Sequence, residues 1–293
     1  MPDAAEQAVG EIGLVFALGI GAIVGSFLNV VAHRLPLGLS VVRPGSRCPA
    51  CRTPVRAVDN VPVLSWLALR GRCRGCQGRI SPRYAIIEIL SALLAGWAFH
   101  VLVAQPELAS EVVAWARWSV VVVVTSALLA ASLIDLDHRI LPNEITKRGM
   151  WAAPVICAFV PRVIIGHGGA PAWVPGAWPA PVQAAVVSIA GIAVGAGSIW
   201  GLGVIGTRVF KKEAMGFGDV KFLGLIGGFV GPAGALLTLV IAAFVGAVGG
   251  VGRLVLTGDR YIPFGPFLAV GAYIELLYAR APLDWYVTVM LSR

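Results

Sequence analysis

Two aspartates lie at the ends of apolar stretches, where a charge is energetically costly. Asp219 follows two glycines in "GFGDVK" (Gly216 to Lys221) and opens a Gly-rich apolar run. Asp135 ends another apolar run in "SLIDLDHRILPNEIT" (Ser132 to Thr146). Ionisable groups at membrane depth usually face the protein interior and often carry function. The pattern therefore indicates that Asp135 and Asp219 are functional residues.

Two carboxyl groups that meet in one site can do acid–base chemistry. They cannot both ionise easily, so one of them keeps its proton. The carboxylate can then take a proton from water while the acid protonates a scissile carbonyl, as in aspartic proteases. We therefore predict that Asp135 and Asp219 are the catalytic pair of a peptidase.

Asp137 competes with Asp135 for this role. Two positions along a helix are about 200° apart, so both side chains cannot face one partner. Asp137 is followed by His138 and Arg139, which is typical of a solvated boundary, whereas Asp135 directly follows "SLI". The sequence favours Asp135.

Three further residues of the second motif are candidate substrate or supporting residues. Gly216 and Gly218 permit close approach of another chain, which suits an extended substrate. A helix N-terminus with Asp219 in its first turn is a compatible interpretation. Lys221 either extends to the membrane interface or acts electrostatically on a nearby carboxylate.

The composition is that of a polytopic membrane protein. Of 293 residues, 58% are hydrophobic and 13% are charged, with a mean hydropathy of +0.84. A soluble domain carries roughly 25% charged residues. We predict an all-α fold of about eight transmembrane helices, because apolar runs near the length of a bilayer recur along the chain. They cover residues 11–33, 84–104, 112–134, 149–166, 182–206, 219–231, 233–256 and 264–280.

The basic residues predict the orientation. Connections 34–83, 135–148, 207–221 and 253–263 hold 19 of the 23 Lys and Arg residues. Since Lys and Arg accumulate in short cytoplasmic loops, these connections are expected to face the cytoplasm. The net charge of +8 is then explained by topology and anionic lipid, and it does not require nucleic acid as a partner.

The first cytoplasmic connection contains two Cys-x-x-Cys pairs. "CPAC" (Cys48, Cys51) and "CRGC" (Cys73, Cys76) could supply four thiolates to a tetrahedral Zn²⁺ ion. Disulfides, redox pairs and iron are alternatives, although the reducing side of the membrane disfavours disulfides. With four sulfur ligands the zinc would be structural, and it would stabilise a loop too short to build its own core.

Several motifs in order resemble the bacterial type IV prepilin peptidase family, which are membrane aspartic proteases with a Gly-x-Gly-Asp signature. "GSFLNVVAHRLP" resembles the first-helix signature of the family, and "DNVPVLSWLALRGRCRGC" with "SPRYAIIE" resembles its cytoplasmic zinc-binding loop. "IDLDHRILPNEIT" and "GFGDVK" resemble its two catalytic motifs, which map onto Asp135 and Asp219.

The resemblance implies cleavage of prepilin or type II secretion pseudopilin leaders at the cytoplasmic face of the bacterial inner membrane. It also implies N-methylation of the new N-terminus with S-adenosylmethionine, with Gly71 linked to that activity by its place before the third cysteine. A turn into the zinc knuckle is the alternative for Gly71. Glu88 is a candidate supporting residue or part of the methylation region, and a structural carboxylate is the alternative. The expected domains are a first transmembrane helix (1–33), a tetracysteine zinc-binding domain (34–83) and a membrane peptidase domain (84–293).

Two other function classes compete with the peptidase. An ion-coupled transporter also uses membrane carboxylates, but it more often places them at mid-bilayer between repeated halves. A zinc-anchored scaffold explains the cysteines and leaves the aspartates without a role. The sequence does not indicate the oligomeric state.

Overall fold

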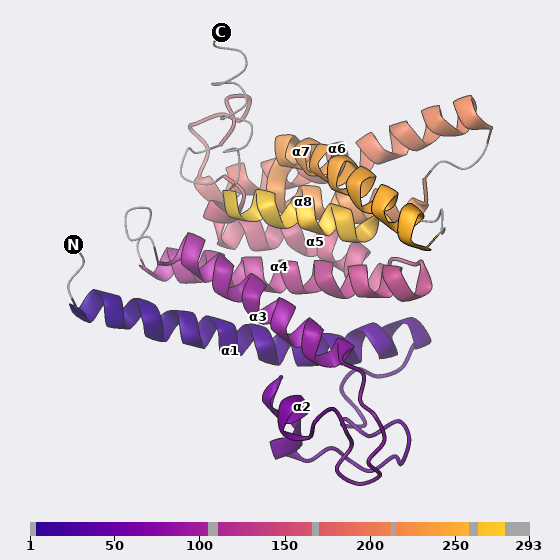
Figure 1. Cartoon of the computed structure of the whole chain (residues 1–293). Helices are drawn as coiled ribbons and strands as arrows, with labels where there is room; N and C mark the ends of the chain where they lie inside the picture. The colour runs from indigo at the N-terminus through magenta and orange to yellow at the C-terminus, as the bar shows by residue number, and fades with distance from the viewer. Residues whose placement is uncertain (1–3, 105–110, 166–169, 212–214, 258–262, 279–293) are drawn as a thin grey trace. The chain divides into compact units, whose positions relative to one another are not determined.

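The computed structural model describes residues 4–104, 111–165, 170–211, 215–257 and 263–278, and it is predominantly helical (Figure 1). Within these ranges the extended pairings are two isolated bridges, Arg47–Pro54 and Arg72–Arg79. This confirms the predicted all-α fold. The α-helices are α1 (Ala4–Arg34), α2 (Leu64–Ala68), α3 (Arg83–Leu102), α4 (Glu111–His138), α5 (Asn143–Phe159), α6 (Ala180–Phe210), α7 (Phe217–Thr257) and α8 (Gly265–Tyr278).

Five helices are long and apolar enough to cross a membrane: α1, α3, α4, α6 and α7. The 14-residue α8 is apolar but shorter, and α5 has 17 residues. The chain is therefore a multi-pass membrane protein. Six of the predicted spans fall on α1, α3, α4, α5, α6 and α8, and the remaining two fall on α7.

Helix α7 is broken at Gly231. The predicted spans 219–231 and 233–256 form one helical element in which Gly231 has φ 77° and ψ 178°. Residues other than glycine rarely adopt this backbone conformation. Pro232 has no N–H group, so it also removes a donor for a helical hydrogen bond. The two residues bend a single element, where the sequence predicted two separate spans.

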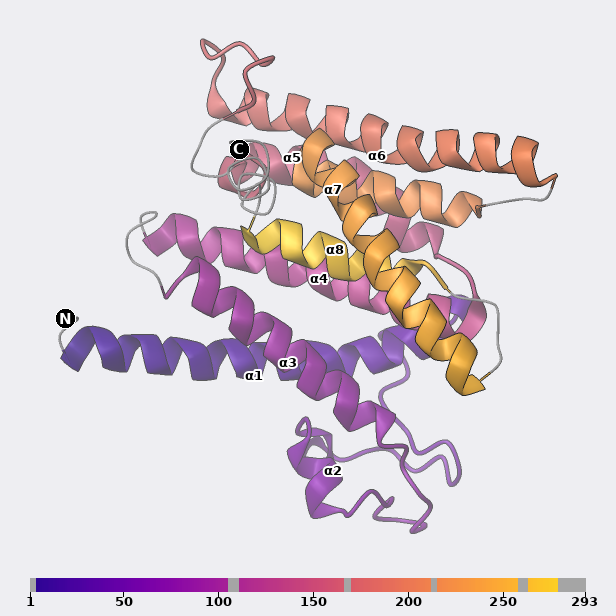
Figure 2. The same ribbon diagram turned by 45° about the horizontal axis from the view of Figure 1, so that its top comes forward.

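The structure divides into two compact units, each described here by itself. The first comprises residues 1–107 and 122–130. In it α1 and α3 run antiparallel and lie side by side in both views (Figures 1 and 2). A Cβ atom at Gly21 would lie 2.6 Å from the carbonyl oxygen of Ser91, and one at Gly25 would lie 2.7 Å from the Cα of Glu88. These glycines let the two backbones pack closely, as is typical in membranes.

The second unit comprises residues 108–121 and 131–293. Figure 2 shows α6 running beside the first part of α7. They meet where a side chain at Gly191 would collide with the backbone of Gly227, and Ser188 donates to the carbonyl oxygen of Gly228 at 2.6 Å. Helix α8 packs on the second part of α7, where a Cβ at Gly271 would lie 2.7 Å from the carbonyl oxygen of Thr238. This unit holds both predicted aspartates.

Candidate active site and metal centre

Asp135 lies in the last turn of α4 with its side chain buried. It is 5% exposed, and its Oδ2 accepts the backbone N–H of Gly265 at 3.1 Å. Asp137, two residues further along, is exposed. Of the two candidates in this motif, the structure places Asp135 inside the protein.

Asp219 is the third residue of α7 and is half-buried. Its backbone N–H donates to the carbonyl oxygen of Gly216 at 3.1 Å, which closes the turn that starts the helix. A Cβ at Gly216 would lie 3.7 Å from the Oδ2 of Asp219. Gly216 therefore lies directly beside the carboxyl group, and it is exposed.

The structure brings Asp135 and Asp219 to one place. Leu141 lies between their supporting backbones: a Cβ at Gly218 and a Cβ at Gly265 would each lie 3.4 Å from its side chain. The negative charge of Asp135 acts directly on Asp219. Two carboxyl groups whose charges interact do not ionise together easily, so one of them can act as an acid while the other acts as a base.

Lys221 does not bind either carboxyl group in the structure. Its Nζ donates to the Oδ1 of Asn143 at 2.8 Å and lies 5.0 Å from the centre of the Phe217 ring. It thereby ties the start of α7 to the first residue of α5. Its contacts are those of a structural clamp at the edge of the site, rather than those of an ion pair with Asp219.

The four predicted metal ligands of the first unit lie together. The Sγ atoms of Cys48, Cys51, Cys73 and Cys76 are all within 4.8 Å of one another, and the pairs Cys48–Cys76 and Cys51–Cys73 are 3.8 and 4.0 Å apart. Tetrahedral Zn²⁺ with Zn–S bonds of about 2.3 Å separates its sulfurs by about 3.8 Å. None of the chain's five cysteines forms a disulfide. The donor set fits a four-coordinate metal ion.

The two Cys-x-x-Cys segments have the same backbone conformation. In the first, the Cys48 N–H donates to the carbonyl oxygen of Thr53 at 3.0 Å, and the Arg52 N–H donates to the carbonyl oxygen of Cys48 at 2.9 Å. In the second, the Cys73 N–H donates to the carbonyl oxygen of Gly78, and the Gln77 N–H donates to the carbonyl oxygen of Cys73, both at 2.9 Å. Arg52 and Gln77 also share a positive φ, 58° and 57°. Each segment is a knuckle that points its two thiols to one side.

The environment of Cys51 and Cys73 favours the thiolate form that binds metal. In contrast, a hydrogen bond with the Gly78 backbone lowers the pKa of Cys76, but hydrogen bonds with the neighbouring thiols outweigh it and raise that pKa to about 11. A hydrogen bond between the Cys51 thiol and the Thr53 hydroxyl is the main cause that lowers the pKa of Cys51 to about 6. Backbone N–H groups of Cys76 and Gly75 lower the pKa of Cys73. Two of the four thiols are thus prepared to lose their protons.

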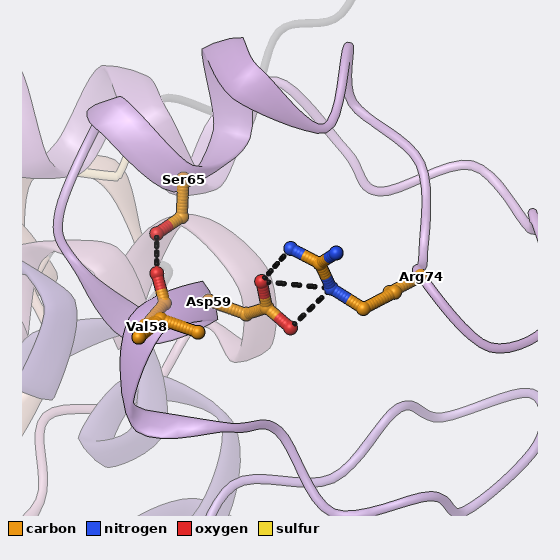
Figure 3. A network of polar contacts seen from close by, with 4 residues as sticks. All are labelled: Val58, Asp59, Ser65 and Arg74. Atoms are coloured by element: carbon orange, nitrogen blue, oxygen red, sulfur yellow. Dashed lines mark hydrogen bonds and ion pairs between the residues drawn. The ribbon is translucent and has the colours of Figure 1, made fainter.

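Polar contacts join the second knuckle to the segment before α2 (Figure 3). Arg74 donates to the carboxylate of Asp59 through Nε at 2.9 Å and through its terminal nitrogen at 2.6 Å. Arg74 holds the pKa of Asp59 below its ordinary value, mainly through these hydrogen bonds. Ser65 of α2 donates to the carbonyl oxygen of Val58 at 3.0 Å. This network fixes the shape of the cysteine-bearing loop.

The two remaining site predictions, Gly71 and Glu88, belong to the first unit. Gly71 has φ 65°, and a Cβ there would lie 3.0 Å from the Trp66 ring, so this position forms a turn against Trp66. Glu88 is 8% exposed and accepts the backbone N–H of Val63 at 2.7 Å. A structural carboxylate was one of the three interpretations of Glu88.

Sequence reasoning missed three residues of these sites. Gly265 and Leu141 contact the aspartate site, and Val63 holds Glu88. A Gly-Pro pair that opens an apolar helix, as Gly265 and Pro266 do, could have indicated a close approach of the helix end to another group. No local pattern predicts the contact of Leu141.

Comparisons with known proteins agree with this geometry. Residues 20–102 match the bacterial peptidase A24 N-terminal domain, and residues 122–251 match the type IV leader peptidase family. The chain is 32% identical to a prepilin leader peptidase/N-methyltransferase of Aeromonas salmonicida (strain A449), over 95% of this chain and 94% of that protein. It is 36% identical to a protein of the same description from Pseudomonas putida, over 90% of each chain.

A third relative is the "type 4 prepilin-like proteins leader peptide-processing enzyme" of Escherichia coli O78:H11, which is 36% identical over 89% of this chain and 92% of that protein. No solved structure matches the chain. The paired aspartates and the cysteine cluster fall in the segments matched by the two domains, and the chain belongs to the type IV leader peptidase family.

Proposed function

We propose that this protein removes the leader peptide of type IV prepilins or type II secretion pseudopilins at the cytoplasmic face of the bacterial inner membrane, with Asp135 and Asp219 as the catalytic pair. The observation that carries the proposal is the meeting of these two residues, 84 positions apart in sequence, around Leu141. The names of the relatives supply the substrate class. The basic connections support the cytoplasmic orientation. Family membership favours a peptidase over the transporter and scaffold hypotheses.

The reaction follows from one shared proton. The ionised carboxyl of the pair takes a proton from water as the water oxygen bonds to the scissile carbonyl carbon. The other carboxyl gives its proton to the carbonyl oxygen, which yields a neutral tetrahedral diol. The C–N bond then breaks as the first carboxyl protonates the leaving nitrogen and a diol hydroxyl returns its proton to the second. The pair ends in its starting state, and no covalent intermediate forms.

The start of α7 is the side from which a peptide can reach the pair. Gly216 is exposed, the ring of Phe217 is 66% exposed, and Asp219 is half-buried. Asp135, by contrast, is buried behind them. An extended peptide laid along the Gly216–Gly218 backbone would place its scissile bond beside Asp219, because neither glycine has a side chain that would obstruct it.

The four cysteines would hold a structural zinc ion. Cys48, Cys51, Cys73 and Cys76 fill all four tetrahedral positions and leave none for water. Zinc there would stabilise the loop and take no part in peptide hydrolysis. The short helix α2 and the Asp59–Arg74 pair complete a loop that has little apolar core of its own.

N-methylation of the new N-terminus is the second activity, and the names of the relatives favour it. S-adenosylmethionine would be the methyl donor. Gly71 and Glu88 remain the candidate residues for this activity, both in the first unit beside the cysteine loop. Transfer of a labelled methyl group to cleaved pilin tests it. A Gly71→Ala variant that cleaves but does not methylate would support a role for Gly71.

The decisive experiment is leader cleavage in liposomes with a prepilin from the same cell. Asp135→Asn and Asp219→Asn should abolish cleavage, and the exposed Asp137→Asn is the matched control that should retain it. Zinc content and thermal unfolding are measured for each variant. Cleavage by both variants at the wild-type rate would contradict the proposed pair.

A further inference from the structure

The first turn of α8 has one backbone N–H group that is available to a hydrogen-bond acceptor outside the helix. Gly265 is the first residue of the helix, so its N–H has no partner within the helix. Pro266 has no N–H, and the N–H groups of Phe267 and Leu268 both donate to the carbonyl oxygen of Phe264, at 3.1 and 3.2 Å. The N–H of Gly265 therefore remains free to bond outside the helix, and its partner is Asp135.

The carboxyl group of Asp135 occupies the space that a side chain at residue 265 would need. A Cβ at Gly265 would lie 2.7 Å from the Oδ2 of Asp135, closer than real Cβ contacts, and 3.4 Å from the Cδ2 of Leu141. Gly265 is buried, and so is Asp135. The absence of a side chain is what lets the end of α8 reach the carboxyl group.

This contact distinguishes the two aspartates electrostatically. Asp219 lies in the first turn of α7, where a negative charge is favoured, whereas Asp135 lies in the last turn of α4, where it is disfavoured. The N-terminus of α8, whose first N–H binds Asp135, acts on that carboxyl group in the opposite sense. Asp135 also accepts a hydrogen bond shielded from water, and such a bond is strongest when the acceptor is ionised. Asp219 is half-buried. The Gly216 backbone that hydrogen-bonds its carboxyl group is exposed, so water competes for that hydrogen bond. The charge that acts on Asp219 from α4 is that of Asp135.

We propose that Gly265 is a positioning residue whose N–H and missing side chain hold Asp135 as the ionised base, so that Asp219 carries the proton. The proposal rests on the catalytic pair proposed above and assigns its two roles. Asp135 takes the proton from water as the new C–O bond forms, and Asp219 protonates the carbonyl oxygen. When the C–N bond breaks, Asp135 returns its proton to the leaving nitrogen and Asp219 recovers one from the diol.

Gly265→Ala tests the position of Asp135. The added Cβ displaces the carboxyl group, so kcat should fall about 100-fold, since a misplacement of about 1 Å can have this effect. KM should change little, because Gly265 lies behind Asp135 and away from the exposed side of the site. The matched control is Gly271→Ala in the same helix, whose Cβ would also meet an oxygen at 2.7 Å, that of Thr238. It should lower thermal stability and leave the shape of the pH–rate profile unchanged.

Replacing the amide of residue 265 by an ester, with glycolic acid in place of glycine, tests the donor without adding a side chain. The base then loses its hydrogen bond, so the acidic limb of the pH–rate profile should move to higher pH by about one unit. This variant also decides the question if Gly265→Ala does not accumulate as folded protein.

The outcomes separate this inference from the proposed pair. If Asp135→Asn and Asp219→Asn still cleave in the same assay, the pair itself is wrong. If both are inactive but the ester leaves the acidic limb in place, Asp135 is not held as the base by Gly265 and the inference is overturned. A limb that moves equally in Gly271→Ala overturns it too, because the effect would then be one of helix packing.

Discussion

The buried carboxylate of Glu88 in α3 accepts the backbone N–H of Val63 at 2.7 Å, and it does so at a strained turn. Val63 has φ 61° and ψ −53°, and Leu64 N–H donates to the carbonyl oxygen of Pro62 at 2.6 Å. This is a γ-turn with a positive central φ, which is rare and is unfavourable for a β-branched residue. Glu88 thus holds the start of α2 against the end of a transmembrane helix.

Removing the Glu88 carboxylate should release this turn. In Glu88→Ala the Val63 N–H loses its acceptor, so hydrogen exchange across residues 62–68 should rise by about tenfold or more. Exchange is followed by mass spectrometry of the detergent-solubilised protein. Glu88→Gln keeps an acceptor oxygen and should stay near wild type, and Val63→Gly should relieve the strain and keep the turn. Unchanged exchange in Glu88→Ala would show that the turn does not depend on Glu88.

Leu141 should matter to catalysis without taking part in it. Its side chain separates Gly218 from Gly265, so Leu141→Ala should let the supports of the two aspartates shift and lower kcat by roughly tenfold to 100-fold. Leu136→Ala removes a side chain of the same size that is 49% exposed, and it should have little effect. The comparison is made by cleavage kinetics. Equal effects of the two variants would argue against a role for Leu141 in alignment.

The cysteine cluster should bind one metal ion per chain, held by all four thiolates. Cys73→Ser should abolish bound zinc and expose the loop 34–83 to proteolysis, since metal binding and folding of such loops are coupled. Cys157→Ser changes a buried cysteine of the second unit and should retain the metal. Elemental analysis of the purified proteins gives the metal content. Full zinc occupancy in Cys73→Ser would exclude the four-sulfur site.

The Asp59–Arg74 pair should slow metal loss modestly. Arg74 is 54% exposed, and exposed ion pairs contribute little, so the rate of zinc transfer to a chelator should rise by less than about tenfold in Arg74→Ala. Arg74→Lys cannot reproduce the two-pronged contact and should behave like the alanine variant. When Arg74→Ala is added to an Asp59→Asn variant, the further change in the rate of zinc transfer should be small. Independent effects of the two substitutions would mean that the pair does not act through its contact.

The sequence predicted what depends on residue type and spacing. The cysteine spacing predicted a cluster that the structure brings within 4.8 Å, and the apolar runs predicted the helices. The preference for Asp135 over Asp137 relied on the apolar residues before Asp135 and on the polar residues after Asp137, and the buried and exposed positions of the two aspartates agree with it.

What the sequence could not predict depends on contacts between distant segments. Lys221 was compatible with the interface or with a carboxylate, and the structure pairs it with Asn143, which is 78 positions away. The hydrogen bond of Gly265 joins residues 130 positions apart, and no local periodicity encodes such a partner. The positive φ of Val63 is equally unpredictable, because tertiary contacts hold it against the preference of a β-branched residue.

The break at Gly231 divides α7 into two arms with different partners. The arm with Asp219 packs on α6 through Gly191 and Gly227, while the arm beyond Pro232 carries α8, whose first residue holds Asp135. Because Asp219 begins the first arm and α8 packs on the second, the backbone angle at Gly231 contributes to where Asp219 lies relative to the Gly265 N–H that binds Asp135.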